Sequence, residues 1–248
     1  MKSFFKIAIA FLVVALATIG TSQATTISLG TASDFAVLGG SGVTNTGTST
    51  FIGDVGSWPT SAIVGITAPM VNGTLYMPAD PATNLAHTDL IDAFTAAMSV
   101  TGGMTGPTDL GGANLNPGVY TYAAAAPWAA GTLTLDALGD SNAQWIFQIG
   151  STLITPGGAA VSLINGASAN NVFWLVGSSA TIGGTNTFAG NILANTSISL
   201  GGGTLDGRAL AIDGAVTIGA QQIVTSVPEP ITICLLAQGA LYLMLKKK

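Results

Sequence analysis

Short apolar runs separated by glycine recur at a fixed spacing in the C-terminal half of the chain. Ser179–Gly183, Ser197–Gly201 and Ala215–Gly219 share one pattern, and the starting positions 179, 197 and 215 are equally spaced. Repeats of this kind are typical of folds in which each unit buries its apolar side chains by stacking on its neighbours. The pattern therefore predicts a mainly β fold, a three-faced β-solenoid with about 18 residues per coil.

The same spacing extends upstream. Leu135 and Leu153 are one such interval apart, and the longer step from Leu153 to Ile182 is interpreted as one coil plus an insertion. Val43–Asn45 aligns with Val216–Ile218, which places the N-terminal part in the same stack. A glycine-rich β-sandwich is the alternative, but the fixed offset favours the solenoid. The inward-pointing ladder is then Leu135, Leu153, Ile182, Leu200 and Ile218.

One segment departs from this pattern and predicts a helix. Asp80 and Pro81 are a favourable N-cap and first helical residue. Two glycines, at positions 102 and 103, end the run, so the helix is expected over residues 81–100. The apolar residues at near-helical spacing are Leu85, Ile91, Phe94 and Met98.

Three predicted strands, 145–149, 172–176 and 192–194, are apolar on both faces. Such strands are buried on both sides, so we expect the long helix to cover the face that they form. Trp145 and Trp174 are expected in the core or beneath the helix. Two other tryptophans, Trp58 and Trp128, lie beside predicted loops. For them, contact with a ligand is a stronger alternative to burial than it is for Trp145 and Trp174.

The residues that alternate with the apolar ladder have to point outward, because successive side chains of a strand lie on opposite faces. Almost all are threonine, serine or small residues. Stacked strands space such rungs about 4.8 Å apart, and the β-branched threonine is stiff. This face can order water at little entropic cost; the alternative is ordinary strand surface, where threonine is favoured anyway. The candidate residues are Thr132, Thr134, Thr152, Ser179, Thr181, Ser197, Ser199 and Thr217, with Thr44 extending the face.

Charge is scarce, at 7% of residues, against about a quarter in ordinary soluble domains. Residues 25–226 hold ten aspartates and one arginine, so their net charge is 1 − 10 = −9. A surface this acidic excludes nucleic acid and anionic lipid as partners. Simple disorder is also excluded, because the chain is 48% apolar. Arg208 is expected at a coil edge beside an aspartate.

Both ends of the chain are predicted to be targeting segments. Residues 1–24 combine two lysines, an apolar run and small residues at a cleavage site, which is typical of a secretory signal peptide. Residues 227–248 contain the tripeptide Pro228-Glu229-Pro230, an apolar run at 231–245 and three terminal lysines. That run is just long enough to cross a bilayer, with the lysines on the cytoplasmic side. Residues 25–226 remain as the one globular domain.

The C-terminal segment resembles the bacterial PEP-CTERM sorting signal, since its three parts stand in the required order. The resemblance implies processing by an exosortase-like enzyme during export. The protein is then expected outside the cell or on the bacterial cell surface, with only a transient membrane anchor. The sole cysteine, Cys234, lies within this tail, so the domain has no thiol chemistry.

The domain itself resembles the microbial ice-binding protein family, an irregular right-handed β-helix with one long helix beside it. The resemblance implies a non-catalytic protein that adsorbs to ice or ordered water through the threonine- and serine-rich face. The similar stretches follow the family's order at residues 35–39, 43–47, 53–56, 115–120, 131–137, 146–153, 171–174, 176–180, 190–194 and 207–211.

Two other functions are alternatives. A cell-surface or matrix protein that binds exopolysaccharide would also suit an exported acidic rod. An enzyme on a β-helix, as in polysaccharide lyases, would need clustered carboxylates or a metal. Asp89 and Asp92 share one helix face but are expected to be solvated, and a lone His87 cannot build a zinc site. We therefore expect no catalytic residue, no metal and no cofactor.

Overall fold

The computed structural model describes residues 27–60, 62–77, 80–219 and 221–224. The predicted signal peptide and the predicted sorting segment lie outside these residues. Within them, no helix is both long and apolar enough to cross a membrane.

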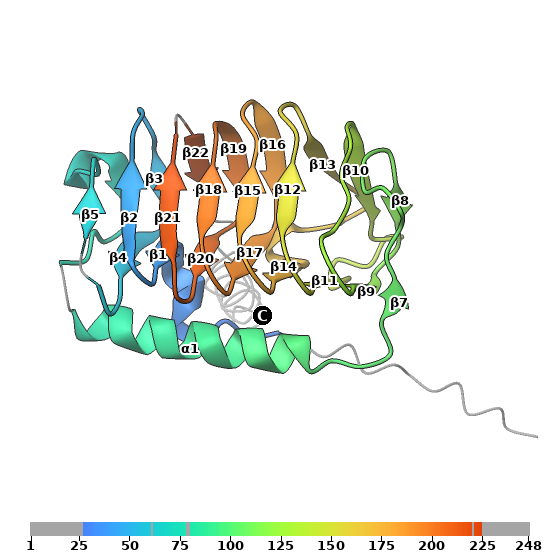
Figure 1. The fold of residues 1–248 in the computed structure, drawn as a ribbon, viewed down its shortest axis with the longest axis horizontal. Helices are drawn as coiled ribbons and strands as arrows, with labels where there is room; N and C mark the ends of the chain where they lie inside the picture. The colour runs from blue at the N-terminus through green and yellow to red at the C-terminus, as the bar shows by residue number, and fades with distance from the viewer. Residues whose placement is uncertain (1–26, 61, 78–79, 220, 225–248) are drawn as a thin grey trace, which may run out of the picture.

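The strands form three sheets, and every pair is parallel among the residues described (Figure 1). Sheet A contains, in order, β4 (Asp54–Ser57), β1 (Phe35–Gly39), β20 (Ala209–Ala211), β17 (Asn191–Ala194), β14 (Val172–Val176), β11 (Trp145–Ile149), β9 (Gly118–Tyr122) and β7 (Met104–Thr105). Sheet B contains β12 (Leu153–Thr155), β15 (Ala180–Ile182), β18 (Ile198–Leu200), β21 (Ala215–Ile218), β2 (Gly42–Asn45) and β5 (Ile63–Val64). Sheet C contains β6 (Val71–Asn72), β3 (Phe51–Ile52), β22 (Gln221–Val224), β19 (Gly203–Asp206), β16 (Asn186–Ala189), β13 (Ala160–Ile164), β10 (Thr132–Asp136) and β8 (Asn114–Leu115).

Four helical segments join the strands in the described part of the chain. The long one is α1 (Pro81–Met98), and the three short 3₁₀ turns are η1 (Gly30–Asp34), η2 (Ala68–Met70) and η3 (Ala169–Asn171). The prediction of a mainly β protein with one long helix is therefore confirmed.

From β11 onward the chain visits sheets A, B and C in turn. Thr181 pairs with Ser199 and Ser199 with Thr217, each pair separated by one repeat of the sequence pattern, as predicted. The first three strands then stack on the last three, with Thr44 opposite Thr217. This confirms the predicted alignment of Val43–Asn45 with Val216–Ile218.

The long helix α1 carries the chain from one end of the stack of strands toward the other. It starts beside β4 and β5 and runs along most of the stack, and the segment after it leads on to β7 (Figure 1). The chain builds its first six strands at one end, returns to the other end through α1, and then winds back.

The predicted register between β12 and β15, on either side of the insertion, is wrong. Leu153 pairs with Ala180 instead of Ile182, so Thr155 is the residue that lies beside Ile182. The physical reason is that Thr155 points inward, with only 3% of its surface exposed. Its hydroxyl accepts hydrogen bonds from the Gly183 N–H at 3.1 Å and from Asn186 Nδ2 at 2.7 Å. Thr155, a buried polar residue, therefore occupies the inward position beside Ile182 that the sequence pattern assigned to Leu153.

Aromatic side chains fill the interior between the sheets. Phe147 stacks on Trp174 with ring centroids 4.0 Å apart. Trp145 is fully buried, which confirms its predicted core position and that of Trp174. Trp128 is also buried and packs against Trp174 and Phe188, so the ligand role left open for it is wrong. Trp58 is half-buried.

The helix covers sheet A, as predicted, but through a different set of side chains. It begins where expected, with the Asp80 carboxylate accepting the Ala82 N–H at 2.9 Å. Leu85 and Ile91, two of the apolar residues whose spacing predicted the helix, are exposed. Small residues let the helix approach the apolar sheet closely, which larger side chains would prevent. The fully or almost fully buried positions on α1 are Thr83, Ala86, Leu90, Ala93 and Ala97.

One polar residue of sheet A fixes the end of the helix. The Gln148 side chain is 9% exposed, and its Nε2 donates to the carbonyls of Ala97, Met98 and Val100 at 2.9, 3.3 and 2.9 Å. The last carbonyls of a helix have no partners within it. Gln148 supplies a donor to the carbonyls of the last two helical residues, and the helix ends at Met98, slightly before the predicted end at position 100.

We expect Gln148→Leu to lower the free energy of unfolding by about 1–3 kcal/mol, because buried carbonyls lose their donor. Equilibrium urea denaturation measures this. The matched control, Leu85→Ala at an exposed helix position, should change it by less than about 0.5 kcal/mol. Equal effects of the two substitutions would contradict the proposed role of Gln148.

Candidate functional site

The outer face of sheet B carries one column of side chains in unbroken register. Each of its six strands contributes one residue, and α1 lies on sheet A instead, below these strands in Figure 1. The two ends of the column are apolar and well exposed, and the four residues between them carry hydroxyls. The column consists of Ile154, Thr181, Ser199, Thr217, Thr44 and Val64.

The flanking positions on this face are small and uncharged. On one side the register aligns Thr152, Ser179, Ser197, Ala215 and Gly42. On the other side stand Gly183, Gly201 and Gly219. A Cβ atom at Gly183 would lie 2.6 Å from the carbonyl carbon of Pro156, so the tight turn there excludes a side chain. The face is consequently flat beside its central column.

The column is held rigid from behind. The strand residues between the outward positions, such as Ile182, Leu200 and Ile218, are at most 1% exposed. Parallel pairing sets the rungs about 4.8 Å apart. Threonine hydroxyls and methyls keep fixed directions on such a surface because χ1 is restricted. The named residues of the column and its flanks carry no charged side chain.

The structure places the predicted site residues on two sheets. Thr181, Ser199, Thr217 and Thr44 lie together in the column as predicted. The predicted flanking residues Ser179 and Ser197 also lie on this face, and Ser197 N–H donates to Ser179 Oγ at 3.3 Å.

The assignment of Thr132 and Thr134 to this face is wrong. Both belong to β10 in sheet C, where they pair with Ala160 and Ser162. Alternation of threonine and leucine separates outward from inward side chains, but it is the same on every sheet. It therefore cannot tell sheet B from sheet C.

Thr152 lies on the face but outside the column. With Leu153 opposite Ala180, Thr152 falls beside Ser179, and Ile154 takes the central position. Ile154 and Val64, which are 58% and 57% exposed, are not among the candidate site residues of the sequence analysis. The two-residue strand that carries Val64 is too short to give a periodic signal.

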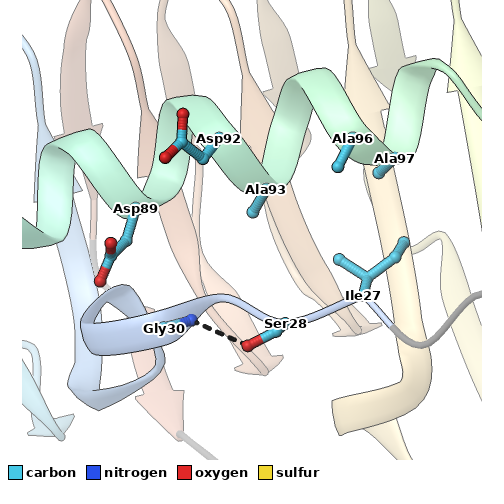
Figure 2. Close-up of a pocket in the computed structure, with 8 residues that line it drawn as sticks. All are labelled: Ile27, Ser28, Gly30, Asp89, Asp92, Ala93, Ala96 and Ala97. Atoms are coloured by element: carbon cyan, nitrogen blue, oxygen red, sulfur yellow. Dashed lines mark hydrogen bonds between the residues drawn. The ribbon is translucent and has the colours of Figure 1, made fainter.

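The helix residues considered for catalysis have packing roles. His87 Nε2 lies 2.8 Å from the Ile212 carbonyl. Asp89 Oδ2 accepts from both the N–H and the hydroxyl of Thr31 at 2.7 Å and is half-buried, whereas Asp92 is exposed, as expected. Figure 2 shows Asp89 directed toward the turn at Gly30, beside a pocket of about 340 Å³, with Asp92 farther along the helix. The described residues hold no group of three or more potential metal ligands.

Arg208 is buried, at 4% exposure, although it was expected at a coil edge. Its Nε donates to the Ser33 carbonyl at 2.8 Å, and its Nη1 donates to the side-chain oxygens of Asn191 and Asn170 at 2.7 and 3.1 Å. Burial lowers the pKa of the guanidinium to about 10, and the nearby charges of Asp34 and Asp206 oppose that shift. Arg208, just before β20, thus ties η1 to η3 and to β17.

Comparison with known proteins agrees with this geometry. The Ice-binding-like family matches residues 37–224. This chain belongs to that family. It is 45% identical over 224 residues to an ice-binding protein of Nostoc sp. (strain HG1), covering 88% of this chain and 82% of that protein. It is 30% identical over 222 residues to an ice-binding protein of Flavobacterium frigoris (strain PS1), covering 82% and 77% of the two chains.

Solved structures of the family have the same fold. An ice-binding protein from an Antarctic biological consortium gives a TM-score of 0.76 at 41% identity, over 81% of this chain and 91% of that one. The protein of the ascomycete Antarctomyces psychrotrophicus gives 0.75 at 37% identity, over 82% and 100%.

We expect Arg208→Ala to lower the free energy of unfolding by about 2–4 kcal/mol, since it leaves buried acceptors unpaired. Arg208→Lys should lose less, because it keeps the charge but not the fork of donors. Urea denaturation distinguishes the two. A change below about 0.5 kcal/mol for Arg208→Ala would show that the network does not hold the N-terminal segment.

Proposed function

We propose that this protein binds ice, without catalysing a reaction, through the outer face of sheet B. The observation that carries the proposal is the in-register column of Ile154, Thr181, Ser199, Thr217, Thr44 and Val64 on a flat, uncharged face. Membership of a family whose relatives are named for ice binding supports the same activity.

The mechanism follows from rigidity and from the absence of charge on the face. Six rungs span about 24 Å at the usual strand spacing. Fixed methyls and hydroxyls order the water above them at little entropic cost, and that water joins the crystal lattice. A charged side chain would instead hold its own hydration shell. The adsorbed protein makes the ice front grow curved between the bound molecules, which inhibits growth and recrystallisation.

The frame of this face is proposed to be a right-handed, three-faced β-solenoid whose regular coils hold about 18 residues each. Support comes from the three parallel sheets, which the chain visits in rotation. Longer coils, such as the one that leads from Trp145 to its partner Val172, carry extra turns between the sheets.

We also infer that the domain of residues 25–226 is exported. The supporting features are the signal-peptide pattern of residues 1–24 and the PEP-CTERM-like order of Pro228, Glu229 and Pro230, the apolar run 231–245 and the basic tail. An exosortase-like enzyme is the proposed processing partner, and the terminal helix is the only proposed contact with the membrane. A matrix protein that binds exopolysaccharide would follow the same route, so ice assays must separate the two functions.

The double substitution Thr181→Tyr and Thr217→Tyr should abolish most ice recrystallisation inhibition and crystal shaping, because bulky rings prevent flat contact. The matched control is Thr134→Tyr, which places the same ring on sheet C and should leave the activity unchanged. Circular dichroism checks that both variants fold. Full activity in the double variant, or its loss in the control, would exclude the outer face of sheet B.

Ile154→Lys should also weaken the activity, raising the protein concentration needed for recrystallisation inhibition at least about threefold, because the ammonium keeps its own water. Leu138→Lys is the control, since Leu138 is 67% exposed and lies after β10, away from sheet B. Equal activity of the two variants would show that the column ends at Thr181.

A further inference from the structure

The last rung of the column on sheet B, Val64, is held only weakly by its own strand. β5 has two residues and lies at the end of the sheet (Figure 1). Ile63 is half-buried, and Val64 is largely exposed. A terminal segment with so little burial opens easily by itself. Val64 therefore needs a further contact if it is to keep a fixed position beside Thr44.

A buried amide supplies that contact from inside the stack. Asn45 is the last residue of β2 and is 5% exposed. Its Nδ2 donates to the carbonyl of Gly65, the residue after Val64, at 3.0 Å and to the Gly47 carbonyl at 2.7 Å. Its Oδ1 accepts the Ser49 hydroxyl at 2.9 Å. The side chain of Asn45 thus joins β5 to β2 and to the turn that follows β2.

The backbone at Gly65 is shaped for this close approach. Its φ is +73°, a conformation that favours glycine. A Cβ atom at Gly65 would lie 2.0 Å from the carbonyl oxygen of Asn45. The chain therefore leaves β5 directly against Asn45, and any side chain at position 65 would push the two apart.

We propose that Asn45 is a positioning residue for ice adsorption, whose amide fixes Val64 as the sixth rung of the face. The inference rests on the proposed function of sheet B. Without the amide, Val64 becomes mobile, and the rigid part of the column shortens to the five rungs from Ile154 to Thr44. A mobile rung has to be ordered each time the face adsorbs to ice, which weakens adsorption.

The test compares Asn45→Leu with Gln148→Leu. Asn45→Leu should raise the protein concentration needed for ice recrystallisation inhibition about threefold, the effect of having to order one side chain on binding. Gln148→Leu is the matched control, because it also removes a buried amide that donates to backbone carbonyls, but on sheet A. It should destabilise the protein and leave the activity of the folded protein unchanged.

Two further measurements separate positioning from general stability. Amide hydrogen exchange should become faster in β5 of the Asn45→Leu variant and stay unchanged in β15 and β18. Val64→Lys should weaken the activity, and adding Asn45→Leu to it should cause no further loss, because both changes act on the same rung. Gly65→Ala is the second variant if Asn45→Leu fails to fold, and it should weaken the activity in the same way.

The positioning role is overturned if Asn45→Leu or Gly65→Ala folds and keeps full activity. It is also overturned if Gln148→Leu loses as much activity, or if the losses from Asn45→Leu and Val64→Lys add. The Thr181→Tyr and Thr217→Tyr double variant distinguishes this failure from failure of the proposed function. Loss of activity there, with full activity in Asn45→Leu, would refute only the role of Asn45, whereas full activity in the double variant would refute the ice-binding face itself.

Discussion

Parallel pairing in register between short strands is the constraint on which the molecule depends. No strand among the described residues is longer than five residues, and none could bury a core alone. Each gains its burial from the strands stacked on either side, so a residue's position in one rung fixes its position in the next. That is why Thr44, Thr181, Ser199 and Thr217 line up although the sequence separates them widely. The same constraint makes the outer face of sheet B flat.

Several aspartates of the domain lie in turns or at the ends of strands. Asp54 accepts the Thr74 N–H, Asp109 accepts those of Gly111 and Ala129, and Asp136 accepts that of Leu138. In these positions a carboxylate satisfies backbone donors where strand pairing ends. The acidic residues therefore stabilise the corners between sheets and leave the central column of sheet B uncharged.

Periodicity alone could predict the repeat, the long helix with its Asp80 cap, the apolar sheet beneath it and four members of the column. Other features depend on contacts that a pattern does not contain. Thr155 faces inward because Gly183 and Asn186 supply its hydrogen bonds, and this shifted Thr152 out of the column. Thr134 alternates as Thr181 does but belongs to another sheet. The buried side of α1 follows from close packing against sheet A, mostly of small side chains, and the spacing of Leu85 and Ile91 does not show that they lie on the exposed side.

The return of the chain through α1 has a consequence for how the domain forms. Strand β1 pairs with β20, so Val37 near the start of the domain meets Ala209 near its end. Until the last turn of the chain has been made, the first three strands expose one unpaired edge, and the later strands expose another. Contacts of such long range slow folding. Completion of the fold therefore waits for nearly the entire polypeptide, because the last strands to be made are the ones on which the first strands stack.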